Sequence, residues 1–379
     1  MNNPFENITI IDYIKTLEQK NIPSVDYRKH IGIYLEFKAR EKAIPLTGSL
    51  ELTPFCNLDC KMCYVHLTKK QFGTRSLLPE EVWKDLIRQA YDCGMRKTSL
   101  TGGECLLYPG FEDIYMYLYE LGIEPSILSN GILIDEKRLA FFKRYPPKRI
   151  QISLYGSSDD AYERVTGHRV FNEVYSNIIR LRETNIPLKI AITPNKYMKD
   201  DIELLLKKAE ELEVPYFINS SLIVPRENTG RNKLDLSLDD YIKIYRRTYS
   251  RKSNVKKTSD LTELQEPNHT NSKRYGLKCG GGKSSFAIRY DGILCPCTSL
   301  TDIAADPKVL GFKKAWEKIN NMALNYPLPV ECGDCGYLDV CPVCVVLHKD
   351  APQKGHCNTL ICERTQRLIK EGFLPSPFD

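Results

Sequence analysis

Between residues 48 and 219, hydrophobic residues recur with two alternating periods, one typical of strands and one typical of helices. Ile150, Ile152 and Leu154, for example, occupy every second position, as in a strand with one buried face. The pattern predicts strands at 49–53, 97–101, 125–129, 149–155, 188–193 and 216–219. It predicts helices at 79–93, 112–121, 135–144, 172–184 and 200–212. Strands that alternate with helices predict a parallel sheet with right-handed crossovers.

Periodicity alone fits either an open doubly wound sheet or a partial barrel, but short polar motifs favour the barrel. The motifs follow five successive strands and comprise 56–64, 101–104, 129–131, 153–156 and 193–195. Parallel barrels carry their chemistry at the carboxyl ends of their strands. We therefore expect an α/β fold with a partial (β/α)6 barrel and one large site ringed by several strands.

Composition describes an ordinary soluble protein of two domains, with 379 residues, 42% of them hydrophobic and 27% charged. No apolar run approaches the ~18 residues that span a membrane, and the first residues lack a secretory pattern. We expect a cytoplasmic protein without membrane contact. Its fourteen cysteines are then better explained by metal ligation than by disulfides.

Charge is concentrated in one segment. Residues 225–278 contain thirteen Lys/Arg and seven Asp/Glu, and the whole chain carries a net charge of +6. A solvated helix and linker explains this composition, and no nucleic-acid partner is indicated. The alternative is a docking face for an acidic peptide, with Arg246, Arg247, Arg251 and Lys252 as its candidate contacts.

The candidate chemistry begins with three cysteines within eight residues, Cys56, Cys60 and Cys63. A cubane iron–sulfur cluster normally takes four thiolates, so three ligands leave one iron open for substrate chemistry. A partial zinc site or buried thiols would be the simpler explanations. The spacing, followed by the aromatic Tyr64, resembles the signature of the radical SAM superfamily, in which S-adenosylmethionine (SAM) chelates the open iron.

This resemblance implies further cofactor contacts. Gly102-Gly103-Glu104 resembles the family's second motif, in which the carboxylate accepts a hydrogen bond from the SAM ammonium. The family often has proline next, where this chain has Cys105, which is best explained as a buried thiol. By the same resemblance Tyr64 lies near the adenine, and the other SAM contacts are Ser129, Asn130, Ser153 and Arg164, the last pairing with the SAM carboxylate.

Nine cysteines lie in residues 279–379. Their spacing does not suit a zinc ribbon or a ferredoxin-type run. Cys279, Gly292 and Cys297, followed by Cys332, Cys335 and Cys341, instead resemble the SPASM domain, the auxiliary-cluster extension of many radical SAM peptide-modifying enzymes. The gap of two residues before Cys344 departs from the usual three, and Cys362 resembles the final ligand.

The SPASM resemblance implies two auxiliary [4Fe–4S] clusters in addition to the cluster that binds SAM. One would use Cys332, Cys335, Cys341 and Cys362, and the other Cys279, Cys297 and Cys344. The fourth ligand of the latter stays open between Cys295, Cys357 and an open iron awaiting a substrate thiolate.

Together these motifs divide the chain into five parts: an N-terminal strap (1–47), the radical SAM barrel (48–224), a basic helical bridge (225–278), the SPASM domain (279–365) and a tail (366–379).

By resemblance, the chain is an enzyme that cleaves SAM to a 5′-deoxyadenosyl radical and modifies a peptide. We expect maturation of a ribosomally made peptide by a thioether, a carbon–carbon cross-link or a related step, with a flavodoxin- or ferredoxin-type electron donor. Anaerobic sulfatase maturation is the alternative, but those maturases carry an Asp where this chain has Thr298. A non-catalytic iron–sulfur electron-transfer protein or a zinc-binding protein is the alternative from another class.

Overall fold

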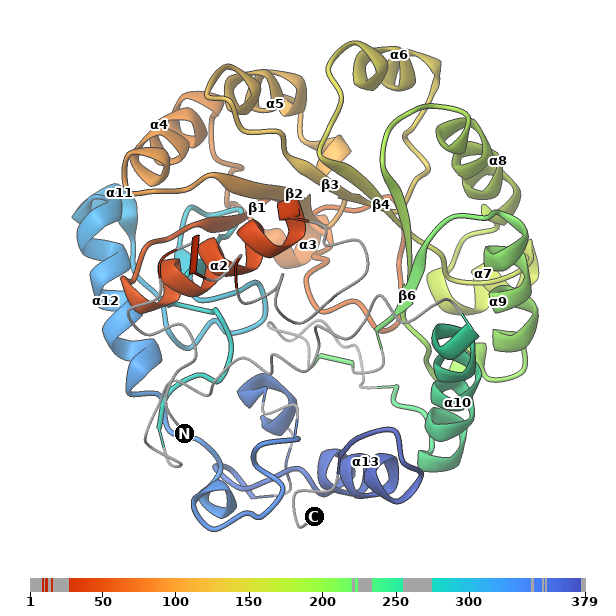
Figure 1. Ribbon diagram of the computed structural model, residues 1–379. Coiled ribbons are helices and arrows are strands. Elements are labelled where there is room, and N and C mark those ends of the chain that lie inside the picture. The colour runs from red at the N-terminus through yellow and green to blue at the C-terminus, as the bar shows by residue number, and fades with distance from the viewer. Residues whose placement is uncertain are drawn as a thin grey trace.

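A computed structural model gives the fold of this chain (Figure 1). It describes residues 9, 11, 12, 15, 27–219, 222–223, 234–254, 275–341, 344–349, 351 and 353–375. Most of the expected N-terminal strap before residue 27 lies outside the described residues. So do 225–233 and 255–274 of the expected basic bridge, together with the side chains of Arg251 and Lys252.

Six parallel strands form the main sheet and follow one another in chain order. They are β1 (Thr47–Thr53), β2 (Lys97–Gly102), β3 (Ser126–Ser129), β4 (Arg149–Ser153), β5 (Leu188–Ile192) and β6 (Tyr216–Ile218). Every predicted strand is therefore confirmed to within about two residues at its ends. Because the strands are parallel and adjacent, the loops after them share one edge of the sheet.

Helices cover the outside of this curved sheet (Figure 1). Those that the pattern predicts are α4 (Glu80–Asp92), α5 (Phe111–Glu120), α6 (Glu136–Arg144), α8 (Phe171–Arg182) and α9 (Ile202–Glu211). The sequence prediction missed α2 (Tyr27–Glu41), α3 (Lys69–Phe72) and α7 (Asp159–Thr166). The later helices are α10 (Leu238–Asn254), α11 (Pro307–Leu310), α12 (Phe312–Leu324) and α13 (Thr359–Lys370).

The sheet is larger than the six strands expected. β7 (Ser285–Ile288) pairs in parallel with β1, and β8 (Leu294–Cys295) pairs antiparallel with β7. The register places Ser49 opposite Ala287 and Leu50 opposite Ile288. The cysteine-rich end of the chain is thus joined to the barrel by backbone hydrogen bonds, next to the strand that leads into the Cys56–Cys63 loop.

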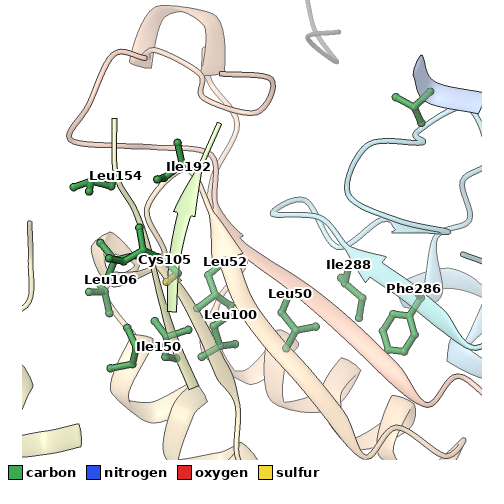
Figure 2. Close-up of a cluster of buried hydrophobic side chains, with 14 of the residues drawn as sticks. Leu50, Leu52, Leu100, Cys105, Leu106, Ile150, Leu154, Ile192, Phe286 and Ile288 are labelled. Atoms are coloured by element: carbon green, nitrogen blue, oxygen red, sulfur yellow. The ribbon is translucent and has the colours of Figure 1, made fainter. Parts of the chain in front are cut away.

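A continuous hydrophobic core fills the space between strands and helices. Figure 2 shows strand residues from both parts of the chain in this core, among them Leu50 and Leu100 of the barrel and Phe286 and Ile288 of β7. The Phe286 ring packs edge-on against the ring of Phe312 in α12, with 5.1 Å between the ring centroids. Each Å² of apolar surface removed from water contributes about 25 cal/mol to the stability of the fold, and this contribution holds β7 and β8 on the barrel.

Among the described residues, none of the helices has the length and apolar character required to cross a lipid bilayer.

Candidate active site

The Cys56–Cys63 loop follows β1 and is held by a helix that lies far away in the sequence. The Asp59 N–H donates to the Thr166 carbonyl at 2.9 Å, and the Lys61 N–H donates to the Val165 carbonyl at 3.0 Å. These are last-turn carbonyls of α7, which have no partner within the helix itself. Both residues that flank Cys60 are therefore fixed without help from any metal.

Backbone donors point at two of the three sulfurs. The Leu58 N–H donates to Cys56 Sγ at 3.4 Å, and the His66 N–H donates to Cys63 Sγ at 3.3 Å. Burial is the main cause that raises the pKa of Cys56 to about 12. A buried thiol surrounded by N–H donors suits a thiolate that is neutralised by metal, because metal binding requires the deprotonated form.

The donor set of the loop limits the kind of metal group that it could hold. Cys56, Cys60 and Cys63 supply three sulfur ligands within eight residues. A cubane takes one thiolate per iron, whereas a structural zinc site takes four ligands on one ion. The three thiols, two of which accept backbone N–H donors, are thus a donor set that a cluster with one open iron would use.

The two glycines of the second motif allow the chain to approach its own backbone. The Gly103 N–H donates to the Thr53 carbonyl at 2.8 Å, and the Glu104 N–H donates to the Phe55 carbonyl at 2.8 Å. A Cβ on Gly102 would lie 2.3 Å from the Thr53 oxygen, and one on Gly103 would lie 2.2 Å from the Phe55 oxygen. The motif thus extends the β1–β2 pairing up to the residue before Cys56.

We expect Gly103→Ala to destabilise the chain by about 1–3 kcal/mol, since the added methyl group collides with backbone that cannot rotate away. The loss should appear as a lower Tm and as a lower iron content after anaerobic reconstitution. Gly32→Ala is the matched control, because a Cβ at Gly32 in α2 meets nothing within 4 Å. An unchanged Tm in Gly103→Ala would contradict the close approach.

Glu104 is fully buried, and donors from the chain surround its carboxylate. Oε1 accepts from the Leu106 N–H at 3.2 Å, and Oε2 accepts from the Asn130 N–H at 2.8 Å and from Ser129 Oγ at 3.1 Å. The Cys105 thiol lies 3.8 Å from Oε1. Burial raises the pKa of Glu104, whereas these donors oppose the rise. Glu104, Ser129 and Asn130 are thus brought together, and they hydrogen-bond to one another.

The other residues that the resemblance assigns to SAM binding are Tyr64, Ser153 and Arg164, and each lies on a different element. The Tyr64 hydroxyl hydrogen-bonds to Thr298 Oγ1 at 3.2 Å, which links the cluster loop to the C-terminal part. Ser153 ends β4, and Arg164 is exposed on α7. Tyr155, which the sequence prediction did not assign, stands beside the loop: burial, and then the neighbouring Cys60, raises its pKa well above the usual value.

The C-terminal thiols fall into two groups. In the first, burial raises the pKa of Cys297, and the nearby Cys279 and Cys344 raise it further. The Leu300 N–H donates to Cys297 Sγ at 3.3 Å. Cys295 is fully buried in β8, opposite Ala287 of β7. The first group therefore contains the three thiols that the SPASM resemblance implies.

The second group contains five thiols, one more than a cubane takes. Burial, followed by Cys341 and Cys335, raises the pKa of Cys332 to about 11. Burial, followed by Cys362, Cys341 and Cys332, raises the pKa of Cys357 to about 12. The backbone agrees: the Val330 N–H donates to the Gly355 carbonyl at 3.0 Å, and the Cys357 N–H donates to Glu331 Oε2 at 2.9 Å. Cys357 thus lies with the second group and not with the first.

Two residues of the expected docking face are engaged within the chain. Arg246 of α10 pairs with Glu371, with Nε 3.0 Å from Oε2, and Arg247 pairs with Glu210 of α9 at 2.9 Å. These ion pairs connect α10 to the segment after α13 and to the barrel (Figure 1). This arrangement favours the structural explanation of their charge over a docking face for an acidic peptide.

The most important feature that sequence reasoning missed is α7, which holds the cluster loop. Its signals were present in the sequence: Ser158 caps the helix by accepting from the Ala161 N–H, and Gly167 ends it with φ 76°. The apolar face of Ala161, Tyr162 and Val165 is buried. The pattern was overlooked because eight residues give little periodicity.

Comparison with known proteins finds a family that the barrel resembles. The model of the radical SAM superfamily matches residues 50–209. The chain is 25% identical over 284 residues to the sporulation killing factor maturation protein SkfB of Bacillus subtilis (strain 168), covering 71% of this chain and 67% of SkfB. It is 24% identical over 332 residues to the antilisterial bacteriocin subtilosin biosynthesis protein AlbA of the same organism, covering 84% of this chain and 68% of AlbA.

Among solved structures, the fold is similar to that of Streptococcus suis SuiB bound to S-adenosylmethionine. The TM-score is 0.65 at 16% sequence identity, and the match covers 92% of this chain and 88% of SuiB. The similarity therefore extends beyond the barrel into the cysteine-rich end.

Proposed function

Because residues 50–209 match the radical SAM superfamily, we propose that this chain is a peptide-modifying enzyme that matures a ribosomally made peptide. The observation that carries the proposal is the three-thiol loop, fixed at the carboxyl ends of the barrel strands with N–H donors on its sulfurs. The substrate class rests on the relatives SkfB and AlbA, which are named for maturation and biosynthesis of a killing factor and a bacteriocin.

Some residues of the chain would hold the cluster, and others fix the position of the loop that carries it. Cys56, Cys60 and Cys63 would hold a [4Fe–4S] cluster, and α7 fixes their loop. When bound, the cluster and SAM supply reductive SAM cleavage and the resulting 5′-deoxyadenosyl radical, which removes a hydrogen atom from carbon. The Tyr64–Thr298 hydrogen bond sets the C-terminal part beside that loop and places Cys297 one residue from the contact.

The two C-terminal thiol groups would hold the auxiliary [4Fe–4S] clusters. Cys279, Cys297 and Cys344 would ligate one cluster, and Cys332, Cys335, Cys341 and Cys362 the other, with Cys357 adjacent to the second. These clusters would accept the substrate's electron or bind its thiolate, and a flavodoxin- or ferredoxin-type protein would supply reducing electrons. Free thiols in this number suit the reducing cytoplasm.

The proposal is tested with anaerobic protein, SAM and dithionite. We expect release of 5′-deoxyadenosine, measured by mass spectrometry, and turnover of a cysteine- or aromatic-rich peptide encoded beside the gene, with loss of two hydrogen atoms for a cross-link. A non-catalytic electron-transfer or zinc-binding protein would release no 5′-deoxyadenosine, and that result would overturn the proposal.

A further inference from the structure

Asn130 lies just beyond β3, and its side-chain amide reaches the cluster loop. Nδ2 donates to Asn57 Oδ1 at 2.6 Å and contacts Cys56 Sγ at 3.6 Å, within the range of an N–H···S hydrogen bond. Oδ1 accepts from the Ile132 N–H at 3.1 Å. A primary amide has two N–H donors and one carbonyl oxygen. Each of these groups therefore has a partner within the chain.

The backbone of Asn130 is fixed as firmly as its side chain. Its N–H donates to the buried Glu104 carboxylate at 2.8 Å, and Glu104 is itself held by the Phe55 carbonyl next to Cys56. Asn130 is only 6% exposed. The ends of β1, β2 and β3 are thus connected by hydrogen bonds, and among these residues Asn130 reaches the sulfur of Cys56.

We propose that Asn130 is a positioning residue that raises the reduction potential of the barrel cluster through its N–H···S hydrogen bond to Cys56, and that it does not contact SAM. The proposal rests on the proposed function, because it requires a cluster on this loop. Reduction adds negative charge to the cluster and its thiolates, and a donor on sulfur stabilises the reduced state. Loss of the donor therefore lowers the potential.

The test is a redox titration of Asn130→Ala without SAM, followed by electron paramagnetic resonance of the reduced cluster. The titration is made in a background that retains only the barrel cluster, so that signals from the auxiliary clusters do not overlap with it. This background has alanine at Cys279, Cys297, Cys344, Cys332, Cys335 and Cys341. We expect the cluster of Asn130→Ala to have a more negative reduction potential than the parent. At a fixed solution potential the ratio of reduced to oxidised cluster should fall about tenfold, which is equivalent to about 59 mV for one electron.

Asn177→Ala is the matched control. Asn177 is also a buried asparagine, and its Nδ2 donates to the Gly131 carbonyl at 2.8 Å in the segment that follows Asn130. The Asn177 side chain hydrogen-bonds to that segment and to Arg180 of α8. We therefore expect the cluster of Asn177→Ala to have the same potential as the parent. Asn130→Leu, which has nearly the same shape and no donor, replaces Asn130→Ala if the latter does not fold.

SAM affinity, measured in the same proteins by isothermal titration, separates this role from the one the family resemblance implies. Positioning through Cys56 predicts a changed potential with an affinity for SAM within about twofold of the parent. The proposal is overturned if the potential of Asn130→Ala is unchanged, if Asn177→Ala shifts it equally, or if only SAM affinity falls. A parent protein with no reducible cluster would instead overturn the proposed function.

Discussion

The variant with alanine at Cys56, Cys60 and Cys63 is expected to lose about four irons per chain and to release no 5′-deoxyadenosine above background. The three thiols supply all the protein ligands of the proposed SAM-binding cluster, so nothing else in the loop can hold it. The barrel should stay folded, because hydrogen bonds from Asp59 and Lys61 to α7 fix the loop without metal. Iron and sulfide analysis, mass spectrometry and circular dichroism measure the three outcomes.

Cys93→Ala is the control for this experiment. Cys93 is a half-buried thiol at the end of α4, and the charged groups that affect its pKa after burial are Lys313, Asp92 and Glu317, not other cysteines. Its removal should leave both iron content and SAM cleavage unchanged. Deoxyadenosine release by the triple variant, or stoichiometric zinc in its parent, would show that the loop does not carry the proposed cluster.

The barrel could be predicted from the sequence because its signals are local. β1, β4 and β5 each have at least two apolar side chains in the core, and most helices have one buried stripe. The pairing of β7 with β1 could not be predicted in this way, because Ser285–Ile288 is only four residues long and its partner lies more than 230 residues earlier. Such a pairing is decided by tertiary packing and not by propensity.

In the candidate site, too, features within one short segment could be predicted from the sequence, and contacts between distant segments could not. The spacing of Cys56, Cys60 and Cys63 and the Gly-Gly-Glu run were visible in the sequence, whereas the partners of these residues were not. The close approach of the two glycines to the Thr53 and Phe55 carbonyls, for example, could not be read from the motif. Contacts of Glu104 and Asn130 with SAM stay a prediction, and the structure adds that these two residues hydrogen-bond to each other. Both contacts join residues far apart in the sequence.

Loss of the second thiol group is expected to have a different effect from loss of the barrel thiols, because its cysteines would hold an auxiliary cluster and not the cluster that binds SAM. The variant with alanine at Cys332, Cys335 and Cys341 leaves only Cys357 and Cys362 of its five thiols, too few to hold a cubane. Cys357→Ala, by contrast, leaves four. The two variants therefore separate loss of the auxiliary cluster from loss of one neighbouring thiol.

We expect the Cys332/Cys335/Cys341 variant to lose about four irons per chain, to keep releasing 5′-deoxyadenosine, and to form no modified peptide. SAM cleavage needs only the barrel loop, whereas completing the modification needs an acceptor for the substrate's electron. Cys357→Ala should keep its iron and its peptide product. Normal product from the Cys332/Cys335/Cys341 variant would show that the reaction does not need this auxiliary cluster. Loss of deoxyadenosine release would instead mean that this cluster passes electrons to the barrel cluster. Parallel assays of iron, deoxyadenosine and peptide mass distinguish these cases, because each gives a different combination of the three readouts.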